Sequence, residues 1–375
     1  MPFGSEPIES GTALAMSGGG FRAVMFHVGS CLRLNDSGVL SDLKRISSVS
    51  GGSIAAGVLA VNWSKLINDG QGRFTNLEDQ FVSPLRAFCG STLDTWSIIS
   101  GALNPFKTAS EEVVDKYRAA LGLGVKLKDL SDDGPRFVFN STNLAIGSSF
   151  RFSKPYCGNY RIGLIEDHKF DVAFAVGCSS AFPPVLSPVD VELDPTLFTK
   201  TEGADLYDQI DFRRKLQLAD GGVYDNLGLE TVWGRYDTIL ASDAGKPFEL
   251  NVSVSALWPM QLMQVLNIGM TQALALRKRM LIHQFQSGVS KGAYYGISTN
   301  IADYGLTDCI QVSPLKIAEF SNIRTRLDKF SEQEQCELIN WGYAVTDAAL
   351  RSKTQWNALP EGGVKLPYPN FPLGK

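Results

Sequence analysis

A serine stands where a short apolar segment meets a pair of glycines. Residues 46–49 (Ile-Ser-Ser-Val) favour a strand, Ser50 follows with glycines at 51–52, and the apolar residues of 54–63 predict a helix. A strand, a sharp turn carrying a serine and a helix form a nucleophile elbow, which exposes the hydroxyl above a helix N-terminus. Most such turns have glycine where this chain has Ser48, another small residue. The segment predicts a nucleophilic serine, and the alternative is a glycine-rich loop that binds an anion.

A second glycine-rich turn precedes this one. Residues 12–16 predict a buried strand, the sequence Ser-Gly-Gly-Gly-Phe-Arg occupies 17–22, and apolar residues at helical spacing continue to about position 32. Glycines between a strand and a helix expose backbone N–H groups, here those of Gly18, Gly19 and Gly20. Donors of this kind, aimed at a developing oxyanion, contribute roughly 3–4 kcal/mol each to catalysis. The turn therefore predicts an oxyanion hole.

Arg22 follows these glycines directly. Its planar guanidinium is suited to a substrate phosphate, and the alternative is a structural ion pair. A nucleotide-binding turn is a further interpretation of the glycines, but their spacing matches neither the dinucleotide-binding motif nor a P-loop.

An aspartate provides the third feature. Asp220 ends a predicted strand over 216–219 and is followed by two glycines. A carboxylate at a strand end is well placed for a site, although Asp-Gly is also a common turn pair. Asp225 and Asp243 are alternative candidates for the same role.

Only three histidines occur, at positions 27, 168 and 283. The order Ser50, Asp220, His283 matches the order of a hydrolase triad, so such a triad is one hypothesis. None of the histidines has a turn or strand-end setting that favours catalysis. The other hypothesis is a Ser50–Asp220 dyad, in which burial raises the pKa of the aspartate and makes it a better base.

Composition narrows the class of protein. The chain has 375 residues, 44% of them hydrophobic and 20% charged, which allows one large α/β domain with insertions or two to three smaller ones. A net charge of −4 argues against a nucleic-acid binder. Six scattered cysteines without metal-ligand spacing indicate reduced thiols. No signal peptide and no apolar run of about 18 residues is found, so a cytoplasmic protein is expected.

Two regions outside these motifs have alternative interpretations. Residues 64–135 are irregular apart from a helix near 111–121, and include an apolar patch within 96–106. They are interpreted as a lid or as an ordinary decorating subdomain. Residues 259–285 predict a long methionine-rich helix with basic residues at 277–279. It is either a lipid-facing surface or a core helix whose methionines fill gaps, and we take the core helix as the expectation.

The three motifs, in this order and spacing, resemble those of the patatin-like phospholipases and are similar to the catalytic core of the cytosolic phospholipase A2 group. The sequence Ser-Ala-Phe-Pro-Pro at 180–184 resembles a further segment of the family, and the resemblance spans about 12–245. It implies a three-layer α/β/α fold with a mostly parallel central sheet. A single catalytic domain over 1–375 is then expected, with a cap insertion at 64–135 and a helical C-terminal extension at 250–375.

The resemblance also implies roles for residues. Ser50 would be the nucleophile, Asp220 the base, Gly18, Gly19 and Gly20 the oxyanion hole and Arg22 a phosphate ligand, with no metal or cofactor. The expected function is hydrolysis of fatty-acyl esters of glycerophospholipids through an acyl-enzyme. Alternatives are a soluble carboxylesterase or lysophospholipase, and a non-catalytic lipid or nucleotide binder. Expected partners are the lipid substrate, the inner face of a membrane and an unidentified regulator.

Overall fold

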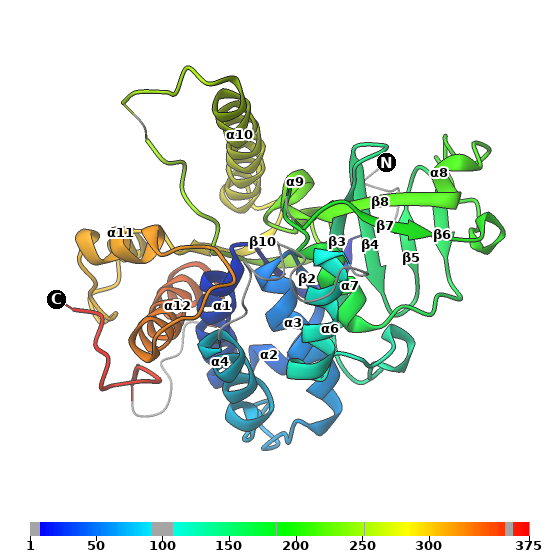
Figure 1. The fold of residues 1–375 in the computed structure, drawn as a ribbon. Coiled ribbons are helices and arrows are strands. Elements are labelled where there is room, and N and C mark those ends of the chain that lie inside the picture. Colours follow the sequence, from blue (N-terminus) through cyan, green and yellow to red (C-terminus); the bar gives the residue numbers. More distant parts are fainter. Residues whose placement is uncertain (1–7, 92–107, 185, 251, 357–362, 375) are drawn as a thin grey trace.

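A ten-stranded sheet runs through the part of the chain that the computed structural model describes, residues 8–91, 108–184, 186–250, 252–356 and 363–374 (Figure 1). One half is parallel. Its strands, in spatial order, are β10 (Lys291–Gly296), β9 (Tyr236–Asp243), β1 (Glu9–Met16), β2 (Leu43–Ser48) and β3 (Arg136–Asn143).

The other half is antiparallel. It comprises β4 (Ser148–Ser153), β5 (Cys157–Asn159) and β6 (Gly163–Ile165) beyond β3, together with β8 (Lys215–Asp220) and β7 (Val189–Glu192). The parallel arrangement expected from the sequence is thus confined to the half from β10 to β3. Parallel strands end at the same edge of a sheet, so the turns after β1, β2 and β9 meet there.

Two strands share one edge of β3 end to end. The last residue of β2, Ser48, lies opposite Phe139, and the last residue of β8, Asp220, lies opposite Ser141. The remaining edge of β3 pairs with β4 over the same length, so β2 and β8 must follow one another along a single edge. Because one strand is parallel and the other antiparallel to β3, their carboxyl ends point at each other across Asn140.

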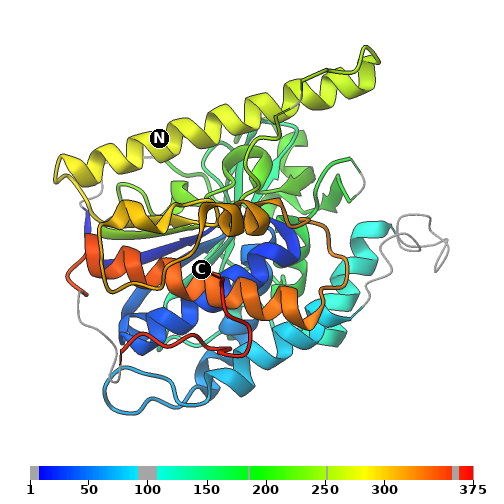
Figure 2. The same cartoon turned by 90° about the vertical axis from the view of Figure 1, so that its left-hand side faces the viewer.

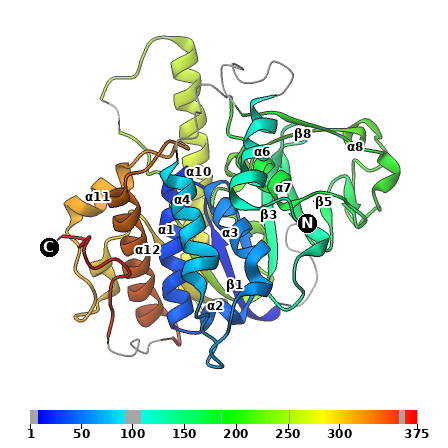
Figure 3. The same ribbon diagram turned by 60° about the horizontal axis from the view of Figure 1, so that its bottom comes forward.

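Helices cover both faces of the sheet unequally. The thicker layer contains α1 (Gly20–Asp36), α2 (Val39–Asp42), α3 (Gly51–Asn62), α4 (Ser83–Gly90), α6 (Ala109–Leu121), α7 (Val172–Ser179) and α12 (Glu332–Lys353), with α11 (Pro314–Asn322) beside α12 (Figure 3). The thinner layer contains α10 (Trp258–Gln286) and the single turn α9 (Gly222–Asp225). The short helix α8 (Asp211–Arg214) precedes β8.

Alternating residues of the strands supply the two cores. Leu14 and Met16 of β1 belong to the large core under α1, α3 and α12, whereas Ala13 and Ala15 belong to the small core with Leu281 of α10. This is the period-two pattern of a strand buried on both faces. The α/β class and the three layers expected from the sequence are confirmed.

The C-terminal third is part of this core, which corrects the interpretation of 250–375 as a helical extension. Strand β10 pairs with β9 in parallel register. Helix α12 packs along α1, and the two backbones approach closely at glycines on each helix. A Cβ atom on Gly29 would lie 1.9 Å from the carbonyl oxygen of Ile339, and one on Gly342 would lie 2.0 Å from that of Phe26. Larger residues at either position would force the helices apart.

The expectation that 259–285 is a core helix is wrong for most of its length. Helix α10 forms where predicted, but among its residues only Leu281 is fully buried. Most of its large apolar side chains face solvent, including Trp258, Leu262 and Val265 at 75%, 59% and 64% exposure.

The region proposed as a lid is partly described. Helices α4 and α6 pack into the large core through Leu85, Phe88 and Tyr117, so these flanks belong to the body of the protein. The apolar patch within 96–106 lies outside the described residues. Movement of this region as a lid stays a prediction.

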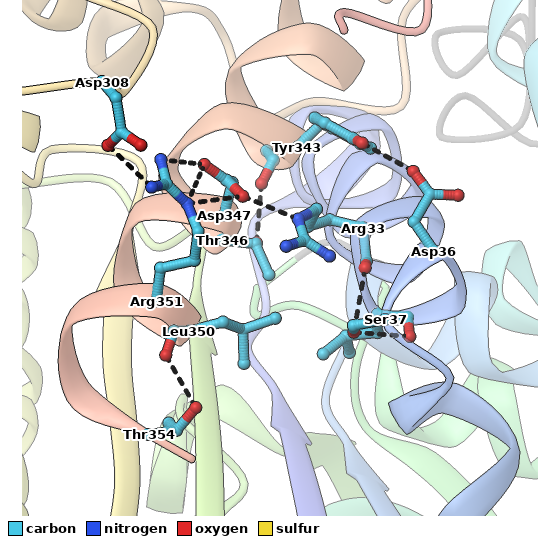
Figure 4. Close-up of polar contacts among 12 residues, drawn as sticks. Arg33, Asp36, Ser37, Asp308, Tyr343, Thr346, Asp347, Leu350, Arg351 and Thr354 are labelled. Carbon is cyan, nitrogen blue, oxygen red and sulfur yellow. Dashed lines mark hydrogen bonds and ion pairs between the residues drawn. The ribbon is translucent and has the colours of Figure 1, made fainter. Parts of the chain in front are cut away.

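A buried ionic cluster fastens α12 to α1 (Figure 4). Asp347 accepts hydrogen bonds from Arg33 of α1 at 2.8 Å and from Arg351 at 2.9–3.2 Å. The side chains of Asp347 and Arg33 are each 1% exposed, and that of Arg351 is 4% exposed. Asp308, which is half exposed, binds the remaining end of Arg351. Asp347 is therefore shared by two buried guanidinium groups, one of which also pairs with Asp308.

We expect Asp347→Ala to lower the free energy of unfolding by about 3–5 kcal/mol, because it removes the carboxylate that pairs with the buried Arg33 and leaves Arg351 with the half-exposed Asp308 alone. Urea denaturation followed by circular dichroism measures the change. Asp308→Ala is the matched control, since it removes the exposed end of the same cluster and should cost much less. Equal losses in the two variants would contradict a dominant role for Asp347.

Candidate active site

Ser50 lies in a strained turn between β2 and α3. Its backbone has φ 52° and ψ −121°, and it is the only non-glycine residue with positive φ in the described part of the chain. Such a conformation costs a residue with a Cβ of order 1–3 kcal/mol and needs support from its surroundings. The Ser50 N–H supplies part of that support by donating to both the carbonyl oxygen and the hydroxyl of Ser179, at 3.2 and 3.1 Å. The structure thus has the expected elbow.

Glycines allow the elbow to contact the turn after β1. A Cβ atom on Gly51 would lie 2.2 Å from the carbonyl oxygen of Gly20, and one on Gly52 would lie 2.6 Å from that of Met16. Ser48, the departure from the usual glycine, fits because its hydroxyl is buried between the Ser53 hydroxyl, which donates to it at 2.9 Å, and the carbonyl oxygen of Val138.

The three glycines expected to form an oxyanion hole are not equivalent. Gly18 lies against Ser50, but its N–H donates to the carbonyl oxygen of Asn226 at 3.1 Å. The N–H groups of Gly19 and Gly20 donate to no group among the described residues, and both glycines have positive φ. Among the three glycines, only Gly19 and Gly20 thus have backbone N–H groups without a partner in the described part of the chain.

Asp220 is buried at the end of β8, with 2% of its surface exposed. Its Oδ1 accepts the N–H of Gly222 at 2.7 Å, and its Oδ2 has no hydrogen-bond partner in the described structure. Burial raises the pKa of Asp220 to about 6, and the Gly222 N–H and the Ser50 hydroxyl partly offset that rise. No hydrogen bond of standard geometry joins Ser50 to Asp220, which is common for catalytic pairs without bound substrate.

The segment after α7 connects the two sides of this pair. Ser179 accepts the N–H groups of both Ser50 and Gly221, each at 3.2 Å, through its carbonyl oxygen, and Ala181 accepts the N–H of Asp220 at 2.9 Å. The Ser179 hydroxyl in turn donates to the carbonyl oxygen of Asn140 at 2.6 Å. Ser179 and Ala181 therefore connect the elbow to the strand end that carries the carboxylate, and they lie at the start of the family-like sequence at 180–184.

The other carboxylates considered for the same role are engaged elsewhere. Asp225 accepts the N–H groups of Leu227 and Glu230. Asp243 accepts the Tyr294 hydroxyl at 2.6 Å and the N–H of Gly245 at 2.8 Å.

None of the three histidines lies beside Ser50 and Asp220. His27 is buried between the Ser242 hydroxyl and the carbonyl oxygen of Ser17, and burial lowers its pKa to about 4. His168 contacts the carbonyl oxygens at 153 and 154. His283 is exposed near the end of α10, next to Gln284, which binds Trp233 at the amino edge of the parallel strands. The triad with His283 is therefore not formed.

Arg22 is not placed to bind a substrate phosphate, contrary to the expectation. It is fully buried, and its guanidinium donates to the carbonyl oxygens of Ser321, Ile323 and Ala244 at 2.7, 2.9 and 2.8 Å. Burial lowers its pKa to about 10. The arginine instead fastens the end of α11 and the turn after β9 to the glycine turn.

Asn226 is a site residue that sequence reasoning missed. Its side-chain amide lies among three glycines: a Cβ atom on Gly18, Gly222 or Gly245 would lie 2.5, 2.6 or 3.0 Å from it. The only sequence signal was its place shortly after the Asp-Gly-Gly motif. Among the described residues, no group of His, Cys, Asp and Glu is arranged to hold a metal ion, and all six cysteines are buried and free.

Fold and site define an α/β protein with a serine elbow, a buried carboxylate and a glycine turn at the carboxyl edge of a parallel sheet. Residues 14–233 match the sequence model of the patatin-like phospholipases. The chain belongs to the patatin-like phospholipase family. A comparison with curated proteins finds no match. None of the helices in the described ranges is both long and apolar enough to cross a bilayer.

Solved structures with a similar fold include two of human GIVD cytosolic phospholipase A2. One has 13% identity and a TM-score of 0.47, and covers 91% of this chain and 61% of that chain. The other, in complex with methyl gamma-linolenyl fluorophosphonate, has 15% identity and a TM-score of 0.48, with 91% and 57% covered. VipD from Legionella pneumophila has 15% identity and a TM-score of 0.35, with 91% and 66% covered. The chain thus spans about three fifths of the human structures.

We expect Asp220→Asn to stabilise the protein at pH 8 by roughly 2–3 kcal/mol. The raised pKa of Asp220, about 6, means that the wild type loses stability as pH rises from about 4 to about 6, because the carboxylate ionises more readily in the unfolded chain. The neutral amide removes this penalty, so the difference should vanish near pH 4. Urea denaturation at several pH values measures it.

The exposed variant Asp205→Asn is the control and should show no gain above pH 6. A stabilisation by Asp220→Asn that did not change with pH would contradict the raised pKa.

Proposed function

We propose that the protein hydrolyses fatty-acyl esters of glycerophospholipids, with Ser50 as nucleophile and Asp220 as general base. One observation supports the proposal: the Ser179 carbonyl oxygen accepts the N–H groups of both Ser50 and Gly221, next to a buried Asp220 whose Oδ2 has no partner among the described residues. Membership in the patatin-like phospholipase family favours a lipid ester over other acyl substrates.

In the first half-reaction the Ser50 oxygen attacks the ester carbonyl, and its proton passes to Asp220 Oδ2. The N–H groups of Gly19 and Gly20 stabilise the oxyanion of the tetrahedral intermediate, because they donate to no other group among the described residues. The carbon–oxygen bond to the lipid alcohol then breaks, and the alcohol takes the proton from Asp220. Acyl-Ser50 and a lysophospholipid remain.

In the second half-reaction water replaces the alcohol. Asp220 removes a proton from water, the hydroxide attacks the acyl carbonyl, and Ser50 leaves with the proton, which releases the fatty acid. A carboxylate with its ordinary pKa near 4 is a weak base for a hydroxyl. Burial of Asp220, which raises its pKa to about 6, strengthens it for both steps.

We expect Ser50→Ala to reduce fatty-acid release from a mixed phospholipid extract by at least about a thousandfold, because no covalent intermediate forms. Mass spectrometry of the products, with wild type beside the variant, measures the rate and identifies the bond that is cleaved. A matched control is Ser30→Ala, which removes a buried hydroxyl of α1 that contacts Tyr295 and not the elbow. Release by Ser50→Ala at the wild-type rate would exclude Ser50 from this role.

The reaction of Ser50 with a phosphonate probe should rise with pH and level off, with a midpoint near 6. Asp220 must be ionised to accept the proton, and its pKa is raised to about 6. Below that pH the rate should fall about tenfold per unit. Labelling rates measured by intact-protein mass spectrometry give the profile. Asp220→Asn should label slowly at every pH, and an unchanged midpoint in this variant would assign the base to another group.

A further inference from the structure

Helix α10 carries an apolar surface that this chain leaves uncovered. Six large apolar side chains of the helix are more than half exposed, and five of them share one face at helical spacing. These five are Trp258, Leu262, Val265, Leu276 and Met280, whereas Met260 lies on the opposite side. The preceding loop also exposes Leu250, Val254 and Leu257, by 90%, 55% and 68%. An exposed apolar face of this extent indicates an interaction site.

The first half of the helix also projects from the body (Figure 2). A helix of 29 residues is about 44 Å long, whereas the six-residue strand β10 that follows it spans about 20 Å. Its second half is fixed to the sheet, because Leu281 is buried in the small core and Gln284 binds Trp233. The excess length therefore extends at the N-terminal end.

That end lies on the side of Ser50. The chain leaves β9 at Asp243, at the carboxyl edge of the parallel strands, and α10 returns it to the amino edge for β10. The N-terminus of α10 must then point beyond the carboxyl edge, where the elbow and the glycine turn are found. A surface that meets the exposed half of α10 also approaches the site.

The charges of α10 select one kind of surface. The helix contains no acidic residue, and its charged residues are Arg277, Lys278 and Arg279. Arg277 is paired with Asp225 and Glu230 on the body of the protein, so among the described residues the uncompensated positive charge of the helix comes from Lys278 and the exposed Arg279. Between Glu249 and Arg277 the sequence has no charge of either sign. An apolar stretch followed by cations matches an anionic bilayer, where apolar side chains enter the lipid and basic ones stay at the headgroups.

The same helix is joined to the segment that follows Asp220. Arg277 lies 3.5 Å from the carboxylate of Asp225 in α9 and over the ring of Tyr224. Lys278 lies over the ring of Tyr294, whose hydroxyl binds Asp243. These contacts hold the helix in a fixed orientation relative to the site.

Helix α10 has an exposed apolar face, which we call the stripe, its first half projects from the body, and its charged residues are all basic. We therefore propose that α10 is the element that docks the protein onto anionic lipid bilayers. Trp258, Leu262 and Val265 enter the acyl region, and the carboxyl edge of the sheet then faces the membrane. The inference rests on the proposed function in that the docked edge presents a lipid-ester site to its substrate.

Binding of the full chain to vesicles tests the proposal. The variant Leu262→Glu/Val265→Glu places two charges on the apolar face, and Gln264→Glu/Asn267→Asp is the matched control, with the same added charge on the other side of the same turns. With vesicles of phosphatidylcholine and phosphatidylglycerol, the stripe variant should sediment with at least about tenfold lower affinity than the wild type. The control should stay within about threefold.

A milder variant, Trp258→Ala/Leu262→Ala, should also bind more weakly and excludes a folding defect as the cause. All the proteins should bind less to vesicles of phosphatidylcholine alone. Equal binding by wild type and both stripe variants would overturn the proposal. So would a wild type that binds no vesicles but forms a dimer which the stripe variants dissociate, measured by light scattering.

Hydrolysis of a short-chain ester in solution separates this proposal from the proposed function. Wild type, stripe variants and control should hydrolyse it equally, because none of the changes touches the site. Vesicle binding without any ester hydrolysis would leave docking in place and refute the enzyme. Ester hydrolysis by a protein whose vesicle binding does not depend on the stripe would support the enzyme and refute docking through α10.

Discussion

The site depends on the pairing of β3. Strand β2 occupies the first part of one edge of β3 in parallel register, and β8 occupies the rest of that edge in antiparallel register. The two strands run toward each other along this edge, so they end on either side of Asn140. Ser48 ends β2 opposite Phe139, and Asp220 ends β8 opposite Ser141. The serine of the elbow follows one end, and Asp220 is the other. Backbone hydrogen bonds, which are costly to leave unmade when buried, hold both in place.

Burial has opposite consequences for stability and for chemistry. The positive φ of Ser50 and the desolvated carboxylate of Asp220 both disfavour the folded state. The surrounding polar groups of Ser179, Ser53 and Gly222 counter part of that cost by hydrogen bonds. What remains is a half-buried serine and a carboxylate whose pKa is raised to about 6. These are the properties that acyl transfer by a dyad without histidine requires.

The two faces of the sheet are covered by helices to different extents. Helices α1 and α12, joined by glycine contacts and by the Asp347 cluster, form a thick layer that stabilises the strands. Helix α10 covers the other face with only part of its length. The small residues Ala13 and Ala15 beneath it leave little apolar surface to bury. The rest of the helix is free to meet another surface.

The local elements and the chemical motifs could be predicted from the sequence. Apolar strands ending in glycine turns predicted β1, β2 and β8, and helical spacing predicted α1, α3, α6 and α10, because these patterns reflect interactions within a few residues. Tertiary structure decided what each side chain contacts. Arg22 follows a glycine turn, yet distant carbonyl groups bury it, and Gly18 gives its N–H to Asn226. The methionine-rich pattern of α10 fits a core helix as well as a surface one. The sheet beneath the helix is shorter than the helix, and this difference in length leaves its first half exposed.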